Sequence, residues 1–76
     1  MNNPRLVFGH NLRRARWLSG LSQRAVMGVS GVSQARISGI EAGEINFGID
    51  TMIRLANAVR LPLWQLFMPE EGHSDA

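Results

Sequence analysis

At 76 residues the chain has room for one compact domain, and its lack of cysteine excludes disulfides and thiolate metal sites. Hydrophobic residues make up 45% of the sequence, which excludes a wholly disordered chain, while the apolar runs are too short to span a membrane. The N-terminus has no signal-peptide pattern, so we expect a cytoplasmic protein without a membrane partner.

The formal net charge of +2 hides an uneven distribution of charge along the chain. All eight cations are arginines within residues 1–68, which contain three acids and so carry a net charge of +5. The remaining three acids lie in residues 70–76. A basic body with a short acidic tail suits a nucleic-acid partner, but a soluble surface that happens to use arginine gives the same balance.

The N-terminal part of the chain predicts a helix from about residue 4 to residue 19. Asn3 followed by Pro4 is typical of an N-cap with proline at the first helical position. Gly20 is a good C-terminal stop, because glycine readily adopts the left-handed conformation there. The apolar residues that fall on one face of this helix are Phe8, Leu12 and Ala15.

A short second helix is expected to begin after Ser22, with Val26 and Val29 on its inner face. The tripeptide Gly-Val-Ser then occurs twice in succession, so either Gly28 or Gly31 is able to supply the turn that follows. We place the turn at Gly31, because this leaves the helix two full turns and glycine accepts positive φ without a steric penalty.

The third predicted helix spans about residues 34–42. Ser33 is its N-cap and Gly43 its stop, while Ile37 and Ile40 face inward. Two short helices joined by a tight turn in this way predict a helix-turn-helix.

The C-terminal third predicts a loop over residues 44–49, a fourth helix capped by Asp50, and a short fifth helix over residues 63–67. The domain is therefore expected to span residues 1–68, with residues 69–76 as a short acidic tail that frays. The apolar stripe of the fourth helix consists of Met52, Leu55, Ala56 and Val59.

Five stretches follow one another in the chain: Phe8-Gly-x-Asn-Leu-Arg-Arg-Ala-Arg16, Gly20-Leu-Ser-Gln23, Gly31-Val-Ser-Gln34, Ile37-Ser-x-Ile-Glu-x-Gly43 and Asp50-Thr-Met-x-Arg-Leu-Ala56. Together they resemble the Cro/C1-type repressor family, also called the Xre family, over about residues 6–68. The resemblance implies an all-α, five-helix, lambda-repressor-like domain with its helix-turn-helix at about 22–43. It also implies a bacterial or phage transcriptional regulator, with repression as the favoured role, that binds double-stranded DNA.

By this resemblance, DNA contacts fall on the second and third helices. Gln23 is expected to hold a phosphate and support Gln34, which reads a base, most naturally adenine. Arg36 pairs with guanine or with a phosphate, and both remain open. Ala35 has only a methyl group to offer thymine, and Gly39 only close approach. The expected DNA-binding residues are Gln23, Arg24, Ser33, Gln34, Ala35, Arg36, Ser38 and Gly39.

The resemblance also implies a buried ion pair between Arg16 and Glu41, which orients the recognition helix more than it stabilises the fold. The sequence departs from the family at Met27, where alanine is usual, and in the loop over residues 44–48, which has no arginine or lysine. The phosphate contacts must then come from backbone amides and from Arg13, Arg14, Arg24 and Arg36.

Two alternatives exist for the apolar residues of the last helix. They form a homodimer interface, as the resemblance implies, or all pack inward. Trp17, which lies off the main apolar face of its helix, is expected to be partly buried. The residues assigned to the dimer interface are Leu63, Trp64, Phe67 and Met68.

The sequence contains no catalytic grouping, cofactor motif or metal-ligating cluster, so we expect neither an enzyme nor a cofactor-dependent protein. His10 and His73 are far apart and are expected at the surface. The alternative to DNA binding is a helix-turn-helix module used for protein–protein interaction, such as an antitoxin that binds a toxin. This alternative is motivated by Ala35, Gly39 and the loop without basic residues.

Overall fold

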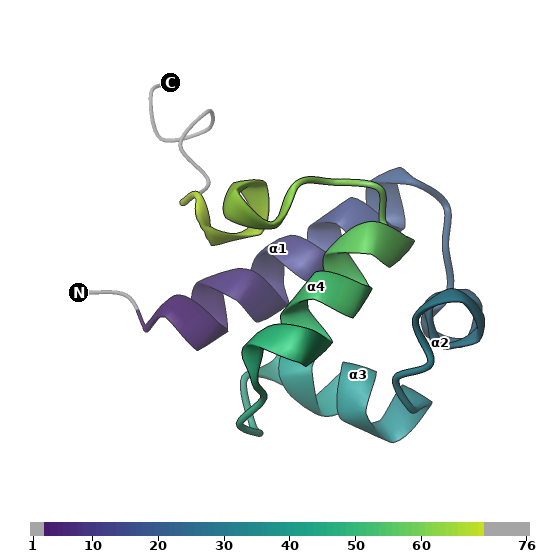
Figure 1. The fold of residues 1–76 in the computed structure, drawn as a ribbon, viewed down its shortest axis with the longest axis horizontal. Coiled ribbons are helices and arrows are strands. Elements are labelled where there is room, and N and C mark those ends of the chain that lie inside the picture. Colours follow the sequence, from purple (N-terminus) through teal and green to yellow (C-terminus); the bar gives the residue numbers. More distant parts are fainter. Residues whose placement is uncertain (1–2, 70–76) are drawn as a thin grey trace.

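The computed structural model describes residues 3–69 and is all-α over that range, with no strand (Figure 1). The N-terminal helices are α1 (Pro4–Leu18), α2 (Gln23–Ser30) and α3 (Gln34–Ala42). They are followed by α4 (Ile49–Ala58) and the 3₁₀ helix η1 (Leu63–Phe67). The tail expected at residues 69–76 lies outside the described residues, except for Pro69.

The fifth helix forms at the predicted residues, but it is a 3₁₀ helix rather than an α-helix. The backbone N–H of Gln65 donates to the carbonyl of Pro62 at 3.0 Å, and that of Met68 donates to the carbonyl of Gln65 at 3.2 Å. These bonds span three residues, which suits a five-residue segment too short for an α-helical ladder.

Helix α1 begins and packs as its sequence predicts. Asn3 accepts a hydrogen bond from the backbone of Arg5 at 2.9 Å, and Pro4 is the first helical residue. Gly20, just beyond the helix, has a φ of +71°. The buried apolar face consists of Phe8, Leu12 and Ala15.

The turn between α2 and α3 lies at Gly31, which has a φ of +77°, and Gly28 stays inside α2. The prediction for Val29 was wrong, because its side chain is 73% exposed. The buried stripe of α2 runs instead from Val26 to Ser30, and Val32 enters the core beyond the turn. In a helix of two turns, the tilt against its neighbours decides whether the third or the fourth residue after Val26 is covered.

Helix α4 begins two residues earlier than predicted, with its N-cap at Gly48 rather than Asp50. Gly48 has no side chain to cap the helix, and Asp50 lies in the first turn. The carboxylate still carries the charge sign that a helix N-terminus favours. Of the expected stripe, Leu55, Ala56 and Val59 are buried and Met52 is half-buried.

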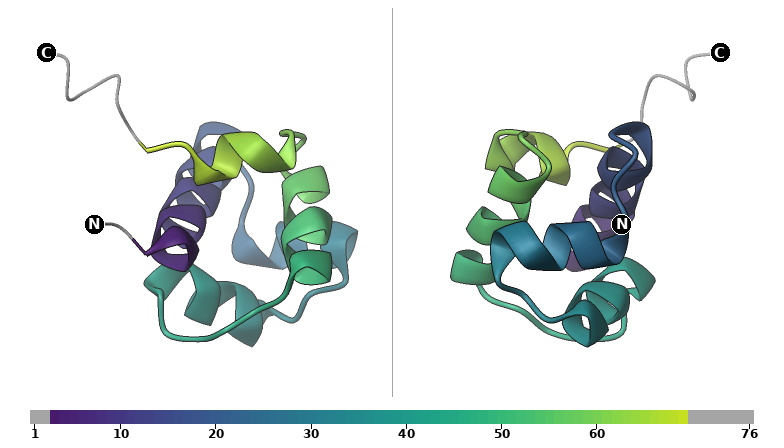
Figure 2. Two further views of the ribbon diagram at one scale, coloured as in Figure 1. Left: turned by 60° about the vertical axis from the view of Figure 1, so that its left-hand side comes forward. Right: turned by 90° about the vertical axis from the view of Figure 1, so that its right-hand side faces the viewer.

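The core lies between α1 and α4, which run as two walls of the molecule (Figure 2). Helix η1 crosses them on one side, and α3 packs under α1 on the other. The ring of Phe8 lies 5.3 Å from that of Phe47 and 5.4 Å from that of Phe67. Helix α1 approaches α3 so closely at Gly9 that a Cβ atom there would overlap the carbonyl of Ile40. This contact fixes α3 against the longest helix.

Candidate nucleic-acid interface

Helix α3 has one face in the core and the opposite face open to solvent. Ile37 and Ile40 are fully buried, as predicted. Ser33 caps the helix by accepting a hydrogen bond from the backbone of Arg36 at 3.2 Å. A short helix anchored along one side therefore presents its other side, and its N-terminus, to a partner. The exposed residues on this helix that the sequence assigns to DNA are Gln34, Ala35, Arg36 and Ser38.

The structure brings Arg16 of α1 and Glu41 of α3 together in a bidentate ion pair. Arg16 Nε donates to Glu41 Oε2 at 2.8 Å, and Nη2 donates to Oε1 at 2.9 Å. Nη1 donates to the carbonyl of Leu21 at 3.0 Å, beyond the end of α1. The hydrogen bond to Glu41 and its negative charge raise the pKa of Arg16, against the opposing effect of burial. The guanidinium therefore stays charged and ties α1 to α3.

Gln23, the first residue of α2, joins this ion pair. Its Nε2 atom donates to Oε1 of Glu41 at 3.1 Å. The sequence predicts that Gln23 holds a phosphate and supports Gln34, and the structure shows in addition this bond from Gln23 to Glu41. The amide nitrogen carries a second hydrogen, which leaves it able to donate to a phosphate. Glu41 thus connects the two helices of the helix-turn-helix to α1.

Gly39 of α3 is half-buried and lies against the side chain of Ile45. A Cβ atom on Gly39 would lie 3.0–3.3 Å from three side-chain carbons of Ile45. From the sequence, Gly39 was expected to offer DNA only a close approach, because it has no side chain. In the structure, a residue from the loop after α3 occupies that place.

The arginines expected to contact phosphates are exposed side chains on three helices. Arg13 stacks over the ring of Trp17 at 4.4 Å from its centroid. Trp17, which was expected to be partly buried, is 60% exposed and so is less covered than expected. His10 is also exposed. The exposed arginines of the expected set are Arg13 and Arg14 on α1, Arg24 on α2 and Arg36 on α3.

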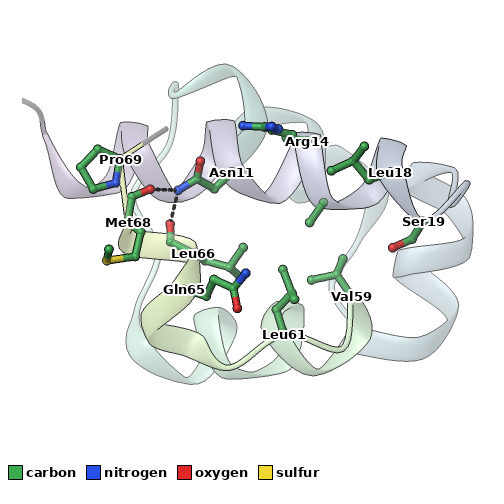
Figure 3. A pocket seen from close by; sticks show the side chains of 11 residues that line it. Asn11, Arg14, Leu18, Ser19, Val59, Leu61, Gln65, Leu66, Met68 and Pro69 are labelled. Carbon is green, nitrogen blue, oxygen red and sulfur yellow. Dashed lines mark hydrogen bonds between the residues drawn. The ribbon is translucent and has the colours of Figure 1, made fainter. Parts of the chain in front are cut away.

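Sequence reasoning missed the role of Asn11, which fastens the C-terminal segment to α1 (Figure 3). Its Nδ2 atom donates to the carbonyls of Leu66 at 2.9 Å and Met68 at 2.7 Å. The segment is also held by Leu66, which is buried. The only signal in the sequence was a polar asparagine on the core side of a helix. Its partners could not be identified, because they lie 55 and 57 residues further along the chain.

The four residues assigned to a dimer interface fall into two classes. Leu63 and Phe67 are half-buried and pack against the core, whereas Trp64 is 64% exposed and Met68 is 45% exposed. The alternative in which all four pack inward is therefore wrong. Trp64 and the C-cap residue Met68 face outward, because a short helix laid on a core buries only one side.

Within residues 3–69, no group of three or more histidine, aspartate or glutamate side chains is placed to hold a metal ion. No helix in this range has the length and apolar character needed to cross a membrane.

A family model described as a helix-turn-helix domain matches residues 7–64. Among solved structures, the restriction-modification controller protein C.AhdI from Aeromonas hydrophila has a TM-score of 0.77 and 31% sequence identity. The match covers 82% of this chain and 94% of C.AhdI.

Two other solved structures share the fold at lower identity. The hypothetical transcription factor NHTF from Neisseria has a TM-score of 0.86 at 23% identity, covering 96% of this chain and 84% of its own. The clp gene regulator ClgR from C. glutamicum has a TM-score of 0.83 at 22% identity, covering 100% of this chain and 97% of its own. A search of curated proteins finds no match.

Proposed function

The chain belongs to the family of helix-turn-helix domains of the Cro/C1 (Xre) type, and on this premise we propose that it regulates transcription by sequence-specific binding to double-stranded DNA. The observation that carries the proposal is the exposed face of α3, whose opposite face is fully buried. The similarity to a restriction-modification controller supports a regulatory role.

In the proposed complex, α3 lies in the major groove with its N-terminus toward the bases. Gln34 is suited to read adenine, and Ala35 and Ser38 complete the contact surface. Arg24 and Ser33 lie at the starts of α2 and α3, where backbone N–H groups favour phosphate oxygens.

The ion pair between Arg16 and Glu41 sets the orientation of α3 in this proposal. Glu41 also fixes the amide group of Gln23 at the start of α2, next to the proposed phosphate contact. The phosphate-binding and base-reading helices are thus held in one geometry by a single carboxylate. We therefore assign Glu41 a positioning role rather than a DNA contact.

The protein is proposed to bind DNA as a homodimer through Trp64 and Met68. Two large exposed apolar side chains, one on η1 and one at its C-cap, favour a partner surface. Helix η1 lies away from α3, so a dimer formed through η1 leaves the exposed face of α3 free to contact DNA (Figure 2). A dimer matches two half-sites that lie about one turn of the DNA helix apart. We include repression in the proposal, because a dimer bound to both half-sites would block polymerase at a promoter that overlaps them.

Selection of binding sites from a pool of random duplexes tests the proposal. The selected duplex is expected to bind the wild-type protein and to lose specific binding to Gln34→Ala, with the helical content of the variant unchanged. Asn57→Ala is the matched control, because Asn57 is an exposed amide side chain on α4, outside the residues proposed to contact DNA or a second protomer. Failure to enrich any sequence, even at low salt, would contradict DNA binding and favour the protein-interaction alternative.

A further inference from the structure

The loop after α3 holds one apolar side chain, Ile45, against the exposed side of the recognition helix. Its Cγ2 atom lies 3.0 Å from the position of a Cβ atom on Gly39, and its Cδ1 and Cγ1 atoms lie 3.3 Å away. Figures 1 and 2 show this connection at the edge of the molecule beside α3. Ile45 therefore fills the space that a side chain at position 39 would take.

Position 39 belongs to the reading face. It follows Ala35 by four residues, so an α-helix places it on the same side as this exposed residue. Ile45 is half-buried, so part of its side chain is accessible over position 39. Ala35 and Ile45 thus bring apolar groups to positions one helical turn apart on this side of α3.

The loop is held in place at both ends, so Ile45 has a defined position. The backbone N–H of Glu44 donates to the carbonyl of Gly39 at 2.8 Å. Phe47, two residues after Ile45, is buried with its ring 5.3 Å from that of Phe8. A side chain fixed before binding is suited to a specific contact, because little conformational entropy is lost.

The chemistry of the loop indicates what this contact would be. Residues 44–48 contain no arginine or lysine, so they have no cationic side chain for a phosphate. The C5-methyl group of thymine is the apolar feature of the major groove, and aliphatic side chains recognise it.

We propose that Ile45, although outside the recognition helix, contacts a thymine C5-methyl group in the major groove in place of a side chain at position 39. The inference rests on the proposed function and goes beyond it, because it assigns base specificity to the loop. It also gives Gly39 a reason to be glycine: a larger residue would displace Ile45.

The test uses the selected duplex, in which each thymine is replaced in turn by deoxyuridine, which lacks only the methyl group. For the wild-type protein, one replacement per half-site is expected to weaken binding about fourfold, as burial of one methyl group allows. For Ile45→Ala, the same replacement is expected to have no effect. The control Ala35→Gly should keep the sensitivity at that thymine.

Three outcomes overturn the inference. One is that no thymine is sensitive to loss of its methyl group, and another is that Ile45→Ala keeps the wild-type sensitivity. Because Ile45→Ala risks loosening the loop, Ile45→Val provides a second variant, which keeps both Cγ atoms beside Gly39 and loses only Cδ1. The third outcome is that Ile45→Val loses as much affinity on replacement of thymine by deoxyuridine as the wild-type protein does. Failure of the selection itself is a separate result, since it contradicts DNA binding as a whole.

Discussion

Arg16 and Glu41 join the first and third helices through two hydrogen bonds of 2.8 and 2.9 Å, and both side chains are almost fully buried. An ion pair of this kind contributes little net stability, because desolvation of both groups offsets their attraction. Removal of one partner alone is costly, since it leaves a buried charge. The pair is therefore better explained by the orientation of α3 than by the stability of the fold.

The first prediction separates these two roles. Arg16→Met should lower the free energy of unfolding by about 3–5 kcal/mol, because Glu41 loses its counter-charge. The double variant Arg16→Met/Glu41→Met should recover most of that loss, yet bind the selected DNA as poorly as the single variant. Chemical denaturation and mobility shifts measure the two effects. Arg5→Met, a change at an exposed arginine, should leave the stability within about 0.5 kcal/mol. Recovery of DNA affinity in the double variant would contradict the orienting role.

The second prediction decides between a base and a phosphate as the partner of Arg36. If Arg36 pairs with guanine, Arg36→Ala should relax the preference at one base pair and cost about 1–3 kcal/mol of binding free energy. If it contacts a phosphate, affinity should fall evenly across sequences and the slope of log K against log salt should drop by about one. We expect the first result, because Arg36 lies in the first turn of the reading helix. Arg24→Ala, at the start of α2, should give the phosphate result and is the comparison.

The third prediction concerns the two glycines that compete for the turn. A Cβ atom on Gly28 would meet nothing within 4 Å, so Gly28→Ala should stabilise α2 by about 0.5–1 kcal/mol. Gly31→Ala should instead destabilise the protein by about 1 kcal/mol, because its φ of +77° strains any residue with a side chain. Thermal unfolding of the two variants should shift in opposite directions. A gain of stability in Gly31→Ala would contradict this account of the turn.

Much of the fold was predictable because its signals are local. The caps at Asn3, Ser22 and Ser33 and the stop at Gly43 each depend on residues within one helical turn, and the structure confirms all four. The errors arose where local signals compete. Asp50 is a good N-cap in isolation, yet α4 begins before it, because the helix is positioned by the burial of its apolar side.

The candidate site was less predictable from the residues alone, because its contacts join distant parts of the chain. The bond from Gln23 to Glu41 spans 18 residues, and the bonds from Asn11 span 55 and 57. No pattern of spacing reveals which of several polar residues meet across the core. The covering of Gly39 by Ile45 also depends on the path of a loop, which sequence periodicity does not determine.

The fourth prediction tests the attachment of the C-terminal segment. Asn11→Asp keeps the size of the side chain but removes the N–H groups that bind the carbonyls of Leu66 and Met68. Because the site is partly exposed, we expect a loss of about 1–2 kcal/mol in unfolding free energy. Hydrogen exchange at residues 65–68 should rise more than exchange in α3. Asn46→Asp, at an exposed asparagine of the loop between α3 and α4, should change neither measurement appreciably. Equal effects of the two substitutions would contradict the assigned role of Asn11.

The fifth prediction uses the two exposed tryptophans to test the proposed dimer. Trp64 on η1 and Trp17 on α1 are 64% and 60% exposed, so replacing either by alanine should change the stability of the monomer to a similar, small extent. If η1 forms the interface, Trp64→Ala/Met68→Ala should dissociate the dimer in sedimentation analysis, since large apolar side chains at the centre of an interface carry most of its binding energy. The affinity for DNA with two half-sites should fall, while binding to a single half-site should stay unchanged. Trp17→Ala should leave both dimer formation and binding to two half-sites intact. If the protein instead stays dimeric when η1 is altered and becomes monomeric when Trp17 is altered, the interface lies on α1 and the proposal for η1 is wrong.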